Sequence, residues 1–258
     1  MRARVIAIAN QKGGVGKTTT AVNLSAALAV AEKETLLLDL DPQANSSSSL
    51  NIRLEREEPC IYDVLIDSVP PSEVIKKTDF PFLSVLPAHI RLVGAEIELV
   101  NVAEREGALK RAVDQIRDKY DFILIDCPPS LGLLTLNGLT AADTVMIPVQ
   151  AEYFALEGLT QLLNTVRLVQ KRLNPALAME GLLLTMFDER LNLSRQVRDE
   201  LRKFFPDHTF TATVHRNVRL AEAPSYGKPA MHIAAASQGA RDYLAVAAEL
   251  MARLVRAA

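Results

Sequence analysis

A glycine-rich turn between a strand-like segment and a helix-like segment restricts the fold of this chain more than any other feature. The turn is NQKGGVGKTTT, residues 10–20; the apolar run RVIAIA precedes it and AVNLSAALAVA follows it. A β-branched run, a glycine-rich turn and a helix in this order are typical of a phosphate-binding loop (P-loop). The pattern therefore predicts a phosphate site at the start of the first helix.

The turn departs from the usual P-loop pattern, G-x-x-x-x-G-K-[ST], at one position. Its end matches, but Gln11 stands where the first glycine belongs, and an extra lysine lies beside it. Glycines still let backbone N–H groups turn toward an anion. A Gly-rich turn with incidental lysines is the alternative, which the flanking strand and helix disfavour. The predicted nucleotide-binding residues of the loop are Gln11, Lys12, Gly13, Gly14, Val15, Gly16, Lys17, Thr18 and Thr19.

The composition fits one large globular domain. The chain has 258 residues and is 49% hydrophobic, with no Pro/Gly/Ser-rich linker, repeat or long charge block. We therefore expect a single domain over residues 1–258. Cys60 and Cys127 have no paired spacing and are expected to be free thiols in a reducing cytoplasm. Because no apolar run approaches the ~18 residues of a membrane span, a cytoplasmic location is expected.

Apolar runs alternate with helix-like segments along the chain. This order predicts an α/β fold, a P-loop nucleoside triphosphatase with a mostly parallel sheet covered by helices on both faces. In such sheets the ligand lies beyond the carboxyl ends of the strands. The predicted strands are RVIAIA, TLLLDL, FLSVLPA, DFILID, TVMIPV and EGLLLT.

Carboxylates stand where this rule requires them. Asp39 and Asp41 close the second run, and Asp126 closes the run FILID. A nucleoside triphosphate binds with Mg²⁺, which takes few protein oxygens, so Thr18, Asp39 and Asp126 are the predicted metal ligands. Asp41, followed by the stiffening Pro42, is the candidate for positioning the attacking water. The run SSSS, residues 46–49, is interpreted as a polar turn or helix cap.

Four motifs resemble the ParA/Soj family of deviant Walker A partition ATPases: KGGVGKTT (12–19), DLDPQAN (39–45), DCPPSLG (126–132) and RNVRLAEAPSYGKP (216–229). The match runs from Val5 to about Arg253. The first three motifs are shared with MinD-like relatives, and the fourth is more specific. The chain starts at its first strand, so the match is to the compact chromosomal type without an amino-terminal helix-turn-helix domain.

The resemblance implies a mechanism and a role for the extra lysine. In the family, the residue at Lys12 reaches across an ATP-bound sandwich dimer to the phosphates of the other subunit, so Lys12, Lys17 and Asp41 are the implied catalytic residues. ATP and Mg²⁺ are the implied cofactors. The ATP-bound homodimer binds double-stranded DNA without sequence preference, and a ParB-type partner stimulates the weak hydrolysis. Chromosome or plasmid partition and a nucleoid-associated location follow.

The resemblance also implies residues beside the adenine base, namely Met186, His215 and Asn217. Relatives usually read PRNVR where this chain reads HRNVR, so His215 replaces a proline. A neutral histidine can stack on a base or hydrogen-bond to it. The first helix lacks the usual glycine near its end and has AEKET there, so its cap must form in another way.

The DNA-binding residues implied by the family are Arg190, Arg219 and Lys228. The net charge of −2 argues weakly against a nucleic-acid binder, but residues 151–258 hold 14 Lys and Arg against 11 Asp and Glu. The basic residues around 195–203 are interleaved with acids, and a solvated amphipathic surface would look the same.

Three alternative functions remain open. Two of them use the same ATPase core, and the third is that of a redox ATPase. A MinD-like membrane-cycling ATPase needs a basic amphipathic carboxyl-terminal helix, whereas DYLAVAAELMARLVRAA adds only Arg253 and Arg256 to its apolar stripe, so a docked helix and no stable membrane association are expected. A ParA-like positioner of a protein cargo would have the same core. A redox ATPase would need cluster-ligating cysteines.

Overall fold

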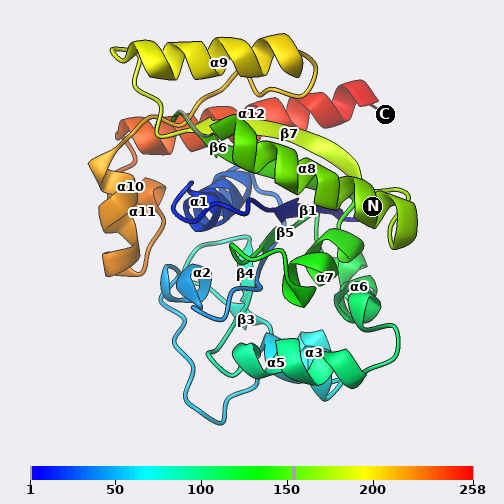
Figure 1. Ribbon diagram of the computed structural model, residues 1–258. Coiled ribbons are helices and arrows are strands. Elements are labelled where there is room, and N and C mark those ends of the chain that lie inside the picture. Colours follow the sequence, from blue (N-terminus) through cyan, green and yellow to red (C-terminus); the bar gives the residue numbers. More distant parts are fainter. Residues whose placement is uncertain (1, 153–154, 258) are drawn as a thin grey trace.

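The computed structural model describes residues 2–152 and 155–257, and these form a seven-stranded sheet flanked by helices (Figure 1). The strand order is β3-β4-β2-β5-β1-β6-β7, with parallel pairing except between β3 and β4. The strands are β1 (Arg4–Ile8), β2 (Thr35–Asp39), β3 (Lys76–Lys77), β4 (Leu83–Leu86), β5 (Phe122–Asp126), β6 (Thr144–Gln150) and β7 (Ala178–Thr185). All six predicted strands are confirmed, and the short edge strand β3 was not predicted.

Helices fill most of the chain between the strands. The α-helices are α1 (Lys17–Val30), α2 (Asn45–Ser48), α3 (Ile61–Ile66), α4 (Pro71–Val74), α5 (Leu92–Glu98), α6 (Ala108–Asp114), α7 (Leu133–Ala141), α8 (Ala155–Arg172), α9 (Asn192–Phe204), α10 (Val218–Glu222), α11 (Ala230–Ile233) and α12 (Gln238–Ala257). The 3₁₀ turns are η1 (Leu99–Asn101), η2 (Arg105–Gly107), η3 (Arg117–Lys119) and η4 (Ala223–Tyr226).

The sheet divides the core into two layers. Successive side chains of a strand point to opposite faces, so Val5 and Ala7 of β1 join one apolar cluster while Ile6 and Ile8 join the other. Helices α3 to α9 pack on the first face, and α1, α10, α11 and α12 contribute to the second. The predicted α/β architecture with both faces covered is therefore confirmed.

Helix α1 begins and ends in left-handed backbone. Gly16 precedes it with φ 87°, which a residue without Cβ adopts freely. At its other end Glu32 has φ 56°; its N–H bonds to the carbonyl of Ala29, and the N–H of Lys33 bonds to that of Leu28. These two bonds form a Schellman cap with glutamate in the position that glycine usually takes. The cap predicted to form without glycine is thus present.

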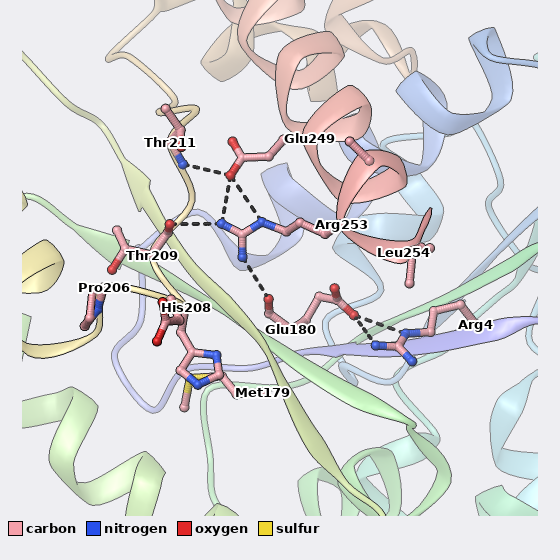
Figure 2. A pocket seen from close by; sticks show the side chains of 12 residues that line it. Arg4, Met179, Glu180, Pro206, His208, Thr209, Thr211, Glu249, Arg253 and Leu254 are labelled. Atoms are coloured by element: carbon pink, nitrogen blue, oxygen red, sulfur yellow. Dashed lines mark hydrogen bonds and ion pairs between the residues drawn. The ribbon is translucent and has the colours of Figure 1, made fainter. Parts of the chain in front are cut away.

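The carboxyl-terminal helix α12 is docked on the body of the molecule, as predicted. Ala247 is buried, and Met251 and Leu254 pack against the core layer that also contains α1. Arg253 fixes the end of the helix to β7 and the segment beside it, because its guanidinium donates to the carbonyls of Glu180 and Thr209 and pairs with Glu249 (Figure 2). The guanidinium also lies 4.0 Å from the centre of the Phe210 ring. The apolar stripe of α12 is therefore largely used in packing.

The sheet register determines where the strand-end carboxylates lie. Asp39 is the last residue of β2 and Asp126 the last of β5, and the two are directly paired in the ladder. Strand β1, which leads into the P-loop, is the other neighbour of β5, with Ile8 opposite Asp126. The ends of β1, β2 and β5 therefore bring the P-loop and both carboxylates to one edge of the sheet.

Candidate functional site

The P-loop has the backbone shape of an anion cradle. Gly14 and Gly16 have φ 74° and 87°, and among the described residues, apart from the chain neighbours of each glycine, no atom lies within 4 Å of a Cβ built on Gly13 or Gly14. The N–H groups in the first turn of α1 have no partner within the helix and lie at its positive end. The loop therefore presents free donors next to open space, which is what a phosphate group requires.

Side chains from neighbouring strands hold this loop in place. Asn10, at the end of β1, donates from Nδ2 to the carbonyl of Pro148 and accepts from the N–H of Lys12. Thr185, at the end of β7, donates from Oγ1 to the carbonyl of Val15 at 2.8 Å. Both side chains are buried, so the loop is supported before any ligand arrives.

Lys17 is buried at the start of α1, with 7% of its surface exposed. Its Nζ donates to the carbonyl of Lys12 at 2.9 Å, across the mouth of the loop. Burial lowers the pKa of Lys17, and the nearby carboxylates of Asp126 and Asp41 oppose this effect. The ammonium therefore lies among anionic groups with one hydrogen bond to its own loop, and a phosphate would be a stronger partner.

Lys12 lies on the rim of the loop and does not point into it. Its Nζ forms an ion pair with Oε2 of Glu152 at 3.0 Å, and the two side chains are 40% and 48% exposed. Gln150 donates to the other oxygen of Glu152. The two lysines of the motif thus have different surroundings, one buried in the site and one held loosely at its edge.

Asp39 is fully buried and hydrogen-bonded on both oxygens. Oδ2 accepts from the N–H and the hydroxyl of Ser47, and Oδ1 accepts from the N–H of Asp41. Burial, and then the charge of Asp126, raise the pKa of Asp39 to about 7. Since Oδ2 already serves Ser47 of α2 and Oδ1 serves Asp41, the part of Asp39 in metal binding stays a prediction.

Asp126 has the free oxygen that Asp39 lacks. Its Oδ2 accepts from the hydroxyl of Ser46 at 2.7 Å, while its buried Oδ1 has no hydrogen-bond partner in the described part of the chain. Burial raises the pKa of Asp126 to about 6, and the hydroxyls of Ser46 and Thr18 moderate the rise. A buried oxygen without a partner is costly unless a further group satisfies it.

Asp41 lies just beyond the end of β2 at the mouth of the site. Its Oδ1 accepts from the N–H of Gln43, which closes a short turn around Pro42. This turn fixes the carboxylate direction, and the side chain is still near enough to Lys17 and Asp126 to affect their pKa values. The position is compatible with the predicted water-positioning role, which stays a prediction.

Two serines of the run 46–49 are part of the site, so its interpretation as a polar turn or helix cap was wrong. Ser46 and Ser47 lie in α2 and bind Asp126 and Asp39 respectively. The Ser47 hydroxyl also accepts from the N–H of Ala88, after β4. The signal was the position of these hydroxyls within ten residues of the second strand's end. Glu152 and Thr185 were likewise missed, because nothing in their local sequence marks them.

The predicted adenine-side residues line one cavity beside the P-loop. It has a volume of about 170 Å³, and Gly16, Thr19, Met186, His215 and Asn217 are among its lining residues. Met186 has a left-handed backbone, with φ 51°. The His215 ring bonds through Nδ1 to the buried Asp242 at 3.0 Å and meets Phe187 edge-on. The structure therefore brings the predicted base-contacting residues next to the phosphate cradle.

The predicted DNA-contacting residues lie outside this cavity; we call Arg190, Arg219 and Lys228 the basic face. Arg190 is 88% exposed and pairs with Asp188 at 2.6 Å, and Arg219 is 60% exposed and pairs with Glu222 at 2.9 Å. Lys228 is half-buried. Helix α9, just after Arg190, buries Ser194, Val197 and Leu201 and presents most of its basic residues outward.

The donors of the site fit a nucleotide with Mg²⁺. The open glycine backbone and Lys17 suit phosphate oxygens, and the adjacent cavity suits a base. Mg²⁺ prefers hard oxygen ligands, and the unpartnered Oδ1 of Asp126 and the nearby hydroxyl of Thr18 are of that kind. The arrangement can therefore hold a polyphosphate, neutralise it and orient a water, which are the requirements for phosphoryl transfer to water.

Comparisons with known sequences agree with this site. A family model described as an AAA domain matches residues 3–179. The chain is 56% identical over 249 residues to the sporulation initiation inhibitor protein Soj of Bacillus subtilis, covering 96% of this chain and 98% of that protein. It is 53% identical over 250 residues to the chromosome partitioning protein ParA of Myxococcus xanthus, covering 97% of this chain and 88% of that protein.

Solved structures with the same architecture include nucleotide-bound proteins. A Mycobacterium smegmatis structure described as cobyrinic acid a,c-diamide synthase with bound ADP and magnesium matches with TM-score 0.87 and 38% identity, over 99% of this chain and 97% of that one. The cell division ATPase MinD of Pyrococcus furiosus matches with TM-score 0.78 and 25% identity, over 96% and 98%. Among the described residues, no helix combines the length and apolar character needed to cross a membrane.

Proposed function

The chain belongs to the Soj/ParA family of chromosome-partitioning P-loop ATPases, and from this premise we propose that it is an ATP-dependent dimerising switch. With ATP bound, two copies join face to face and bind double-stranded DNA without sequence preference. A ParB-type partner stimulates the weak hydrolysis and so releases the DNA. Repeated capture and release then moves chromosome or plasmid copies apart.

The observation that carries this proposal is the separation of the two P-loop lysines. Lys17 occupies the site of its own subunit, so a single lysine completes the cradle. Lys12 is exposed on the rim and bound to an equally exposed glutamate, so it can reach a phosphate on a second subunit at little cost. A compact ammonium there would neutralise charge that otherwise repels two ATP-loaded faces.

The chain's own residues have distinct roles in the proposed hydrolysis. The P-loop backbone and Lys17 bind the phosphates, and the cavity around Met186, His215 and Asn217 holds the adenine. Thr18 and Asp126, together with Asp39, would hold Mg²⁺, which would supply positive charge to the phosphate oxygens. Asp41 positions the attacking water.

DNA binding is proposed for the basic face, with Arg190 and Arg219 as the main contacts. Each dimer offers two copies of both arginines, whereas a monomer offers one of each, so affinity for a polyanion should rise on dimerisation. A MinD-like membrane cycle is disfavoured by α12, because its Met251, Leu254 and Arg253 pack on the body of the molecule. The similarity to the chromosome partitioning protein ParA of Myxococcus xanthus favours DNA as the cargo.

The test combines light scattering with DNA binding in one set of samples. Wild type with Mg²⁺ and a slowly hydrolysed ATP analogue should become a dimer and bind nonspecific duplex DNA. Lys12→Ala should bind the analogue with affinity within about threefold of wild type, because its ammonium lies outside the local cradle, yet remain a monomer. It should then bind DNA as weakly as the nucleotide-free protein.

Lys33→Ala, at the far end of α1, is the matched control and should behave as wild type. An undiminished ATP-dependent dimer in Lys12→Ala would remove the role assigned to Lys12. Absence of DNA binding by a wild-type dimer would leave nucleotide-dependent dimerisation but contradict the DNA part of the proposal.

A further inference from the structure

Helix α5 and the turns around it are apolar on two opposite faces. The inner face, Leu92, Ala95 and Leu99, is buried in the core. The outer positions Ile90, Val93, Ile97 and Val100 are 56%, 52%, 73% and 54% exposed, and their spacing of three, four and three residues aligns them on one side of the helix. We call these four residues the α5 face. A surface helix of a monomer normally has one apolar side, so a second side indicates an interaction surface.

The α5 face is held rigidly by the side chains behind it. Arg91 forms a two-pronged ion pair with Asp63 of α3 and donates to the carbonyl of Glu58. Its guanidinium also lies 5.4 Å from the centre of the Tyr62 ring, and the Tyr62 hydroxyl donates to Glu98. Because α5 is fixed to α3 in this way, the four apolar side chains are presented without further ordering of the backbone.

Negative charge borders the face. Glu98 flanks the stripe on one side, and Asp67 of the α3 end is near enough to Tyr62 to raise its pKa together with Glu98. Glu96 lies on the other side, but its Oε1 is buried near Gly132, so its carboxylate turns toward the body of the molecule. Neither Glu98 nor Asp67 is in an ion pair within the described part of the chain, whereas Arg91 is balanced by Asp63. The apolar stripe therefore has an acidic rim.

We propose that the α5 face is a docking site for a basic amphipathic helix of another protein. The stripe from Ile90 to Val100 is about 15 Å long at 1.5 Å per residue, which matches three turns of a partner helix. Apolar side chains of that helix cover the stripe, and flanking Lys or Arg meets Glu98 and Asp67.

The charge pattern selects this occupant over the two obvious alternatives. A second copy docked through the same face would bring two acidic rims together, and an anionic membrane would be repelled by the rim. The site also lies at the opposite end of the molecule from α9 (Figure 1). The inference goes beyond the proposed function, because it requires neither nucleotide nor DNA.

The test uses the full chain without nucleotide and a labelled 14-residue model peptide of Leu and Lys, with leucines at helical i, i+3, i+4 and i+7 spacing. Fluorescence anisotropy should show saturable binding that weakens at least tenfold in the double variant Val93→Ser, Ile97→Ser. The matched control, Val30→Ser with Leu168→Ser, changes two similarly exposed apolar residues on α1 and α8 and should bind as wild type.

Charge and pattern are tested with two further peptides and one further variant. A Leu/Glu peptide of the same spacing and a scrambled Leu/Lys peptide should each bind at least tenfold more weakly. Glu98→Gln with Asp67→Asn should weaken the Leu/Lys peptide about threefold, since exposed charge pairs contribute modestly.

Several outcomes would overturn the proposal. Wild-type affinity in the Val93→Ser, Ile97→Ser variant would place the peptide elsewhere, and equal binding of the Leu/Glu peptide would remove the role of the rim. Nucleotide-free self-association in sedimentation velocity that this variant abolishes would assign the face to a second copy. Binding to phosphatidylglycerol vesicles that the variant abolishes would assign it to a membrane. ATP-dependent dimerisation and DNA binding of the same variant, measured separately, test the proposed function independently.

Discussion

The strand-end edge and the basic face hold their charges in contrasting ways. At the strand-end edge, Lys17, Asp39 and Asp126 are buried, and the oxygen Oδ1 of Asp126 has no partner in the described part of the chain. On the basic face, Arg190 and Arg219 are exposed, and each is paired with an acid of its own chain. The strand-end edge thus contains buried charged groups that are not fully satisfied by protein partners, whereas the arginines of the basic face are already neutralised by ion pairs.

The difference shows how the two regions can respond to an anion. Desolvation at the strand-end edge has already been overcome during folding, so a phosphate meets preorganised donors and the interaction is strong. On the basic face a phosphate must first displace Asp188 or Glu222, and water and salt screen whatever is gained. Affinity should therefore be concentrated at the edge, and salt sensitivity on the face.

The largest expected effect comes from removing the buried lysine. Lys17→Ala should weaken nucleotide binding about 1,000-fold, or about 4 kcal/mol. The variant loses the Coulomb attraction between the ammonium and the polyphosphate, which is strong in a partly desolvated site. Fluorescent-nucleotide titration measures it. Lys228→Ala on the basic face is the control and should leave this affinity unchanged. A loss below tenfold would break the contrast between the two regions.

Next in size is the pH dependence of the ligand-free protein. The pKa values of Asp39 and Asp126 are raised by burial to about 7 and about 6, so protonation favours the folded state. Their contribution is complete below about pH 4 and is lost as pH rises from there through 6 to 7. Urea unfolding without Mg²⁺ should show this fall in the free energy of unfolding.

Asp126→Asn sharpens that test. The variant removes one buried charge and keeps an acceptor for Ser46, so it should be more stable than wild type at pH 7.5 and have a shallower pH profile. Asp207→Asn, at an exposed turn, should follow wild type. A variant that tracked the wild-type profile would show that the two carboxylates are not the source of the pH dependence.

A smaller effect is expected on the basic face. Arg219→Ala removes two phosphate contacts per dimer, so the slope of log K against log salt should flatten by roughly 1.8. Titrations of nonspecific duplex at several salt concentrations, with a slowly hydrolysed ATP analogue, measure the slope. Arg2→Ala, at the amino ends of the strands, is the control. An unchanged slope would move the DNA-binding surface elsewhere.

The smallest effect concerns the acid that neutralises an arginine. Asp188→Asn frees Arg190 from its ion pair, so DNA binding should tighten about two- to threefold at low salt, within the range of an exposed pair. Asp188→Glu retains the charge and serves as the control. Weaker binding in Asp188→Asn would mean that the pair orients Arg190 for DNA rather than competing with it.

The same contrast explains what the sequence could predict. Six strands and the positions of Asp39, Asp41 and Asp126 followed from apolar runs and from the rule that ligands lie beyond the carboxyl ends of parallel strands. Backbone pairing determines these positions, as the register between Asp39 and Asp126 shows. The first lysine of the motif could likewise be separated from the second by its offset from the P-loop pattern.

Side-chain partners could not be predicted in this way. Ser46 and Ser47 bind the two buried carboxylates because α2 folds back over the strand ends. The hydrophobic pattern of the sequence does not predict this position of α2. Glu152 reaches Lys12 from 140 residues away. Asp188 and Glu222 lie close in sequence to Arg190 and Arg219. Whether such neighbours form ion pairs depends on side-chain rotamers, which the sequence composition does not determine. The exposed stripe of α5 was also missed, because its apolar spacing alone does not distinguish it from the buried stripe of Leu92, Ala95 and Leu99.

The ion pair between Lys12 and Glu152 has a consequence for timing. Exposed side chains change rotamer in picoseconds to nanoseconds, and an exposed pair contributes about 0–1 kcal/mol. A typical enzyme takes about a millisecond or longer per turnover. The ion pair with Glu152 therefore gives Lys12 a defined position, and it breaks too quickly to slow the movement of Lys12 measurably. In the proposed cycle, the lifetime of the closed dimer is then determined by the slow events at Asp41 and Asp126, and changing Glu152 would alter how many molecules are closed rather than how long each one stays closed.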